Sequence, residues 1–143
     1  MPSLPTALLD IVTALHWLAI VAWIGGLFFA CLVLRPALSS LPAATREQAW
    51  QATMARLLPW LWAGMALLFI TGLAQVYAIF GSFRFAAARV HWMAAAASLM
   101  LALFLVMRFG PWRSSQRAHH RLLAAQLAIG LLTLLAINHL QER

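Results

Sequence analysis

The sequence is poor in charge, and the charges it has are mostly of one kind. Only 9% of its 143 residues are charged, and lysine is absent, so all ten basic residues are arginine. Hydrophobic residues make up 64% of the chain, whereas soluble domains are roughly half apolar. This composition excludes an ordinary soluble domain and indicates an integral membrane protein.

Acidic residues and cysteine are also scarce. Three acidic residues against ten basic ones give a net charge of +7, a balance that nucleic-acid-binding proteins share. The arginines flank apolar runs and form no basic face, so we do not expect nucleic-acid binding. The single cysteine, Cys31, excludes an internal disulfide and a site built from several thiolates of one chain.

The N-terminal segment lacks the features of a removable signal peptide. The stretch MPSLPTALLDIVTALHW has no basic region at its start and no small-x-small cleavage site. We therefore expect it to be retained as the beginning of the first helix.

Four apolar runs are long enough to cross a bilayer. A hydrocarbon core about 30 Å thick needs roughly 20 apolar residues in a helix. The charged residues separate such runs at 11–34, 57–80, 90–107 and 122–141. Since short connections make consecutive helices neighbours, the sequence predicts an all-α fold, with residues 1–143 as a single transmembrane domain folded into an antiparallel four-helix bundle.

The connections between these runs predict the orientation. The first connection contains residues 45–56, TREQAWQATMAR, which have the character of a short interfacial helix. Seven arginines lie in the first and third connections and three on the other side. Because cytoplasmic loops carry the excess of positive charge, we expect a bacterial inner-membrane protein with both termini on the periplasmic side.

Three histidines from three runs are expected at the outer level of the membrane. At about 100° per residue, His16 shares a helix face with Trp23, and His91 shares a face with small residues. Both are therefore expected to point into the bundle. His139 lies opposite the polar stripe of its helix and is expected at the periphery, where it remains a candidate third metal ligand. Because an imidazole within a membrane span is costly, it is a functional hypothesis by default.

Other polar residues near this level are candidates for the same site. Gln75 and Tyr77 are the expected polar companions of the histidines, and Trp23 could form a wall beside a cofactor. Arg84 and Arg89 at the outer rim could pair with the propionates of a haem. The alternatives are structural hydrogen bonds for the histidines and ordinary loop positions for the arginines.

Methionines and a histidine pair form two further patterns. Met93, Met100 and Met107 recur every seven residues, a spacing that could provide soft ligands for Cu(I). Helical phase puts this stripe far from His91, so we interpret it as membrane packing. His119 and His120 are interpreted as the interfacial start of the fourth helix.

The first run resembles the start of the CopD (copper resistance D) family. Its sequence LHWLAIVAWIGGLFFACLVLRPAL is similar to the L-H, W-x-G-G and R-P-A pattern of that family at His16, Trp23, Gly25, Gly26, Arg35 and Pro36. VHWM at 90–93 is similar to the start of the third helix in small CopD-like proteins. The family is associated with copper uptake or tolerance, so the resemblance implies copper bound by His16 and His91, with or without His139.

CopD proteins are similar in appearance to the HemJ family of membrane protoporphyrinogen oxidases, which bind haem b through a histidine of the first helix. This resemblance implies haem b with His16 and His91 as axial ligands. HemJ-like proteins carry a lysine in the third helix, which this chain lacks, and the resemblance therefore does not extend to their oxidase activity.

Three functions remain open from the sequence. The chain could handle copper and exchange it with a periplasmic metal carrier, or hold haem b and exchange electrons with a redox partner. It could also be a structural subunit of a larger membrane complex. Whether it catalyses a reaction, and whether it forms a homo-oligomer, are left open.

Overall fold

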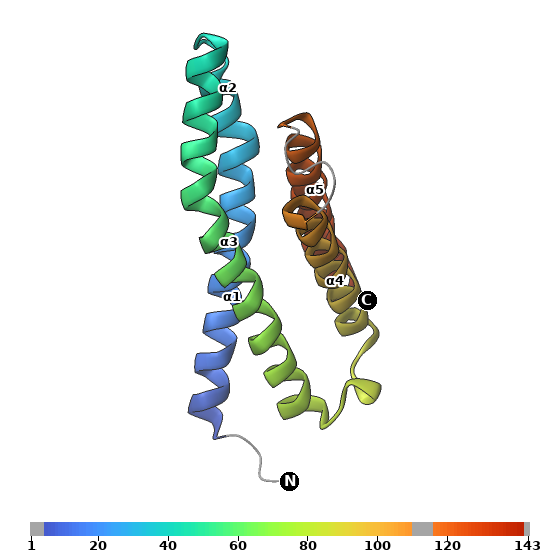
Figure 1. The fold of residues 1–143 in the computed structure, drawn as a ribbon. Coiled ribbons are helices and arrows are strands. Elements are labelled where there is room, and N and C mark those ends of the chain that lie inside the picture. The colour runs from blue at the N-terminus through green and yellow to red at the C-terminus, as the bar shows by residue number, and fades with distance from the viewer. Residues whose placement is uncertain (1–4, 110–115, 142–143) are drawn as a thin grey trace.

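The structure, a computed structural model, describes residues 5–109 and 116–141 and is shown in Figure 1. Within these residues there are helices and no strand, so the expected all-α class is confirmed. The elements in chain order are α1 (Thr6–Phe28), the π-helix η1 (Phe29–Leu34), α2 (Arg35–Leu38), α3 (Ala43–Phe80), the 3-10 helix η2 (Phe83–Phe85), α4 (Ala88–Phe109) and α5 (Gln116–Gln141).

In the described part of the chain, four helical segments are long and apolar enough to cross a membrane. They are Thr6–Leu38, Ala43–Phe80, Ala88–Phe109 and Arg117–Ile137. These are the lengths and compositions of a multi-pass membrane protein. Arg113 and Arg143, which enter the arginine count used for orientation, lie outside the described residues.

The first segment continues through a wide turn rather than ending at the first arginine. In η1 the backbone N–H of Arg35 bonds to the carbonyl of Ala30, five residues back. Pro36 follows, and its ring has no N–H and crowds the carbonyl four residues before it in a regular helix. A π turn widens the helix at this point, so the chain stays helical as far as Leu38.

The second segment is a single long helix. Residues 45–56, expected as a separate interfacial helix, join the run 57–80 without a break in α3. At about 1.5 Å per residue, the 38 residues of α3 extend about 57 Å, well beyond the roughly 30 Å of a hydrocarbon core. Figure 1 shows the result, since α2 and the start of α3 reach past the start of α5.

A bend divides α3 into two halves. Pro59 lies inside this helix, where its ring removes one backbone hydrogen bond and clashes with the carbonyl of Ala55. The N-terminal half runs beside α1, whereas the C-terminal half diverges from α1 toward α4 (Figure 1).

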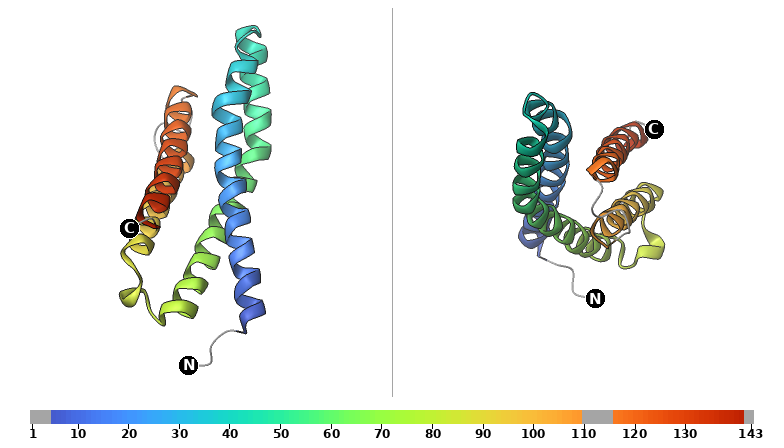
Figure 2. Two further views of the ribbon diagram at one scale, coloured as in Figure 1. Left: turned by 180° about the vertical axis from the view of Figure 1, so that it is seen from behind. Right: turned by 45° about the horizontal axis from the view of Figure 1, so that its top comes forward.

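The helices associate as two pairs. α1 packs most extensively on α3, and α4 on α5, whereas α3 and α4 touch little. Figure 2 shows the two pairs from behind and from a tilted angle, with α5 facing α1. The pairs are therefore joined mainly through the contact of α1 with α5 and through side chains in the centre.

An aromatic cluster in the centre connects the two pairs. The fully buried ring of Phe104 on α4 packs edge-on against Trp23 of α1, with ring centroids 5.2 Å apart. The same ring lies 4.5 Å from that of Trp62 on α3. The buried core extends from Trp23 toward α2 and includes Leu27, Ala30, Leu61, Met65, Met107, Leu123 and Leu127.

Two adjacent glycines of α1 offer a matched test of this packing. A Cβ on Gly26 would lie 2.9 Å from Leu61 Cδ2, whereas nothing lies within 4 Å of a Cβ on Gly25. Both glycines are inside the helix, so leucine at either position gains similar helix propensity. We expect Gly26→Leu to lower the free energy of unfolding by about 1–3 kcal/mol relative to Gly25→Leu, because the α1–α3 contact is overpacked. Thermal unfolding of the two variants in detergent measures this difference, and equal midpoints would contradict it.

Candidate functional site

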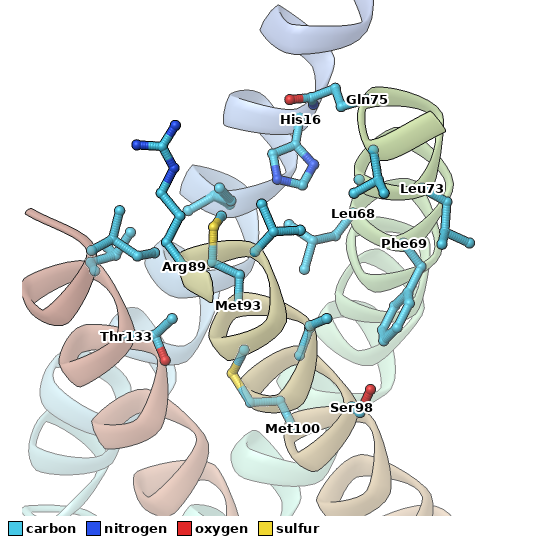
Figure 3. Close-up of a pocket in the computed structure, with 18 of the residues that line it drawn as sticks. His16, Leu68, Phe69, Leu73, Gln75, Arg89, Met93, Ser98, Met100 and Thr133 are labelled. Atoms are coloured by element: carbon cyan, nitrogen blue, oxygen red, sulfur yellow. The ribbon is translucent and has the colours of Figure 1, made fainter. Parts of the chain in front are cut away.

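A cavity of about 580 Å³ lies between the two helix pairs. It begins at Trp23, where the closed core ends, and its walls come from α1, the C-terminal half of α3, α4 and α5. Cofactor and ligand pockets typically enclose about 300–1,000 Å³ and are mainly apolar with a few placed polar groups. The lining fits that description, because its polar side chains are His16, Gln75, Arg89, Ser98 and Thr133, with the Trp23 indole N–H (Figure 3).

The His16 imidazole is held by a hydrogen bond from α1 to α3. Its Nδ1 lies 2.9 Å from Oγ1 of the buried Thr71. The Thr71 hydroxyl donates its one proton to the carbonyl of Leu67, at 2.6 Å. We therefore expect Thr71 to accept from His16, with the proton on Nδ1. In the neutral ring Nε2 then keeps its lone pair, the arrangement that a metal ligand requires.

Gly72 provides the space for this imidazole. A Cβ at Gly72 would lie 3.3 Å from His16 Cε1, closer than side chains normally pack. The ring therefore rests directly against the backbone of α3. Figure 3 shows it projecting from α1 into the space above Met93.

Two buried N–H donors at the wall have no partner in the described part of the protein. They are Nε1 of Trp23 and Nε2 of Gln75, both on residues that line the cavity. A buried donor without a partner costs roughly 1–3 kcal/mol. Both N–H groups are unpaired but covered by protein atoms, so a ligand in the cavity would reach them only after neighbouring side chains move.

The α4 wall carries one cation and two sulfur atoms. Arg89, Met93 and Met100 all line the cavity and lie on one helix face. In Figure 3, Arg89 and Met93 lie toward the His16 end of the cavity, and Met100 lies deeper. The sequence predicted only membrane packing for these methionines, because they lie on the opposite side of the helix from His91.

His91 lies outside the cavity, in contrast to the expectation from helical phase. It is exposed, its Nδ1 donates to the carbonyl of Ala87 at 3.2 Å, and its ring packs edge-on against Phe83 at 4.8 Å. The cavity face of α4 is the one that carries Arg89 and Met93, and His91 is two residues, or about 200°, from each. The structure therefore does not bring His16 and His91 together.

The other candidates from the sequence also lie away from the cavity. Tyr77 is 59% exposed, because it is about 200° around α3 from Gln75. Arg84 is exposed on η2, and His139 is exposed on α5. The polar stripe of α5 opposite His139 points inward, since Gln126 and Gly130 are buried and Gly130 and Thr133 line the cavity.

The paired histidines belong to the opposite end of the molecule. His119 Nε2 bonds to the carbonyl of Met107 near the end of α4, at 3.3 Å, where helix carbonyls lack partners of their own. The His120 ring packs at a tilt against that of Trp50. Among residues 5–109 and 116–141, no three His, Cys, Asp or Glu side chains gather as a metal cluster.

The sequence also holds signals for Met93, Met100 and Thr71, which were not predicted as site residues. One face of α4 lines the cavity and carries Arg89, Met93, Ala97 and Met100 at helical spacing. Because Arg89 was a predicted site residue, its helix face would have indicated that the two methionines line the same site. Thr71 and Gln75 share one stripe of α3, and that stripe meets α1 at His16. The role of Gly72 has no local signal, because it depends on which ring lies opposite.

Comparison of the chain with models of known families, with curated proteins and with solved structures finds no match.

The tautomer of His16 is directly measurable. Nitrogen NMR of histidine-labelled protein is expected to show His16 with its proton on Nδ1. Thr71→Val removes the acceptor, so it should shift the ring toward the Nε2–H form and lower the free energy of unfolding by about 1 kcal/mol. Thr71→Ser retains the hydroxyl and is the control. A wild-type ring protonated on Nε2, or no response to Thr71→Val, would be inconsistent with this assignment.

Proposed function

We propose that the protein is a membrane haem b protein that transfers electrons, with the haem held in the cavity through Nε2 of His16. The observation that carries this proposal is the His16–Thr71 bond, which presents a ring nitrogen with a free lone pair to a cavity of about 580 Å³. A large apolar cavity with one imidazole is suited to a broad hydrophobic cofactor rather than to a bare ion, which needs several ligands close together.

The residues of the lining fit the parts of such a cofactor. His16 would hold the haem iron through Nε2, and Met93, which lines the same cavity, is the candidate for a second ligand, since His/Met pairs hold haem in some cytochromes. Arg89 is the cation that would pair with a propionate carboxylate. Haem b, when bound, supplies one-electron redox chemistry.

The chain's own residues set the conditions at this site. Thr71 orients the imidazole and fixes its proton on Nδ1, which increases the basicity of the coordinating nitrogen. The closed core beyond Trp23 excludes water from one side of the cavity. The apolar walls lower the local polarity, which shifts the redox potential of a bound metal centre.

We also propose that the four helical segments cross a bacterial inner membrane as an antiparallel bundle with both termini periplasmic. The support is the arginine distribution, because Arg35 begins α2 and Arg46 lies in the first turn of α3, at the end of the molecule away from the start of α1. The cavity would then open near the periplasmic surface, where a redox partner could approach.

The optical spectrum of the purified protein tests this function. We expect a haem Soret band at near-stoichiometric yield, its loss in His16→Ala, and haem affinity reduced about 10–100-fold in Thr71→Val, as for other groups that orient metal ligands. Gly72→Ala should weaken binding by displacing the imidazole, whereas Gly64→Ala, whose Cβ would lie 4.0 Å from the nearest atom, should not.

His91→Ala and His139→Ala are the matched histidine controls, since both residues are exposed outside the cavity. Their spectra should equal that of the wild type. Haem that survives His16→Ala but is lost in His91→Ala would contradict the proposal, as would protein that neither contains haem nor takes it up.

A second candidate function is copper handling, because the thioethers of Met93 and Met100 line the same cavity as His16. Thioether and imidazole ligands suit Cu(I). If this is the function, the protein without haem should bind Cu(I), and both His16→Ala and Met93→Leu/Met100→Leu should weaken binding at least about tenfold.

The double leucine variant separates the two functions. It keeps the volume and polarity of the wall but removes both sulfur atoms. Equal Cu(I) affinity in the wild type and the variant would exclude a thioether copper site. Haem binding should persist in the variant through His16, with an altered spectrum if Met93 is the second ligand.

A further inference from the structure

A second cavity lies at the other end of the molecule and shares no residue with the first. It encloses about 280 Å³ where α2 ends and where α3 and α5 begin. Its lining is compact and mostly polar, and consists of Arg35, Leu38, Ser39, Arg46, Trp50 and His120.

Two guanidinium groups from different helices meet at this cavity. Arg35 is the first residue of α2, Arg46 lies in the first turn of α3, and both are exposed. In the described part of the chain neither pairs with a carboxylate. The acidic residue of this region, Glu47, does not line the cavity, and its Oε1 accepts a hydrogen bond from Gln51 Nε2. The cavity therefore carries two arginines without a paired carboxylate, while the Glu47 carboxylate is near enough to interact electrostatically with the His120 ring.

One wall is rigid. Trp50 is only 4% exposed, and its ring lies against that of His120, with centroids 4.3 Å apart and planes at 55°. This contact fixes the start of α5 against α3 and holds His120 beside the arginines. The Ser39 hydroxyl already donates to the carbonyl of Pro36, at 2.6 Å, so the available donors are the two guanidinium groups and the His120 ring.

The cavity lies where two of the four apolar runs end, the first and the fourth. Arg35 directly follows the first apolar run, and His120 and Arg121 directly precede the fourth. In a bilayer this boundary is the level of the lipid phosphates. Basic pockets between helices on the cytoplasmic side recognise anionic lipid headgroups, and the guanidinium fork matches two oxygens of a phosphate.

We propose that this cavity is a phosphate-binding site in which Arg35 and Arg46 hold the anion and His120 supplies a further N–H donor. The phosphate is that of an anionic phospholipid headgroup or a free phosphate. The site is independent of what occupies the first cavity.

The full-length protein, freed of lipid in detergent, tests this proposal. Its thermal midpoint is followed during titration with short-chain phosphatidylglycerol, with short-chain phosphatidylcholine and with inorganic phosphate. We expect a rise with phosphatidylglycerol or inorganic phosphate and none with phosphatidylcholine. In Arg35→Gln/Arg46→Gln the affinity should fall at least about tenfold, since each charge-assisted bond contributes that much or more.

Arg56→Gln/Arg84→Gln is the matched control, because it removes the same charge from two exposed arginines outside the cavity. Arg35→Lys/Arg46→Lys keeps the positive charge but removes the planar guanidinium that can bind two phosphate oxygens at once, so it should give an intermediate affinity. A rise with phosphatidylglycerol alone assigns the site to a lipid headgroup, and a rise with inorganic phosphate assigns it to free phosphate. No rise with either anion, or equal responses of the cavity and control variants, overturns the proposal.

Discussion

The bend of α3 at Pro59 is the constraint on which the rest of the arrangement depends. A straight helix of this length would follow α1 from end to end and fill the space beside it. Because the proline interrupts the backbone hydrogen bonds of α3, the N-terminal half stays on α1 and the C-terminal half turns toward α4. The first half contributes to the closed core, and the second forms a wall of the cavity that contains His16.

The core and the cavity are successive layers of one interface. Phe104 fills the space between Trp23 and Trp62, so the two helix pairs close together at this level. On the His16 side of Trp23 the pairs separate, and smaller or more flexible side chains line the space. Since aromatic rings supply much of the buried area in such a contact, the position of Phe104 determines where the cavity begins.

The chemistry of the site follows from how few hydrogen-bond partners an apolar environment offers. The Thr71 hydroxyl gives its proton to its own helix, so it can only accept from His16. This one hydrogen bond orients the ring and favours the tautomer with the proton on Nδ1. The Trp23 and Gln75 donors have no such partner, and buried donors of this kind are usually paired in folded proteins. The site thus contains one hydrogen-bonded imidazole, that of His16, and two buried N–H donors without a partner among the described residues.

The sequence by itself determined that there are four apolar helical segments, because apolar length and charge placement are local properties. It did not determine that the first continues to Leu38 or that the second begins at Ala43. It did identify His16, Trp23, Gln75 and Arg89, which all line the cavity. Only the tertiary structure decided which other residues meet them. His91 and Tyr77 face outward, and Met93 faces inward. Successive residues are about 100° apart around a helix, so a small rotation of a helix about its axis changes which side chains face the cavity. These rotations and the bend at Pro59 depend on packing between segments that are distant in the sequence.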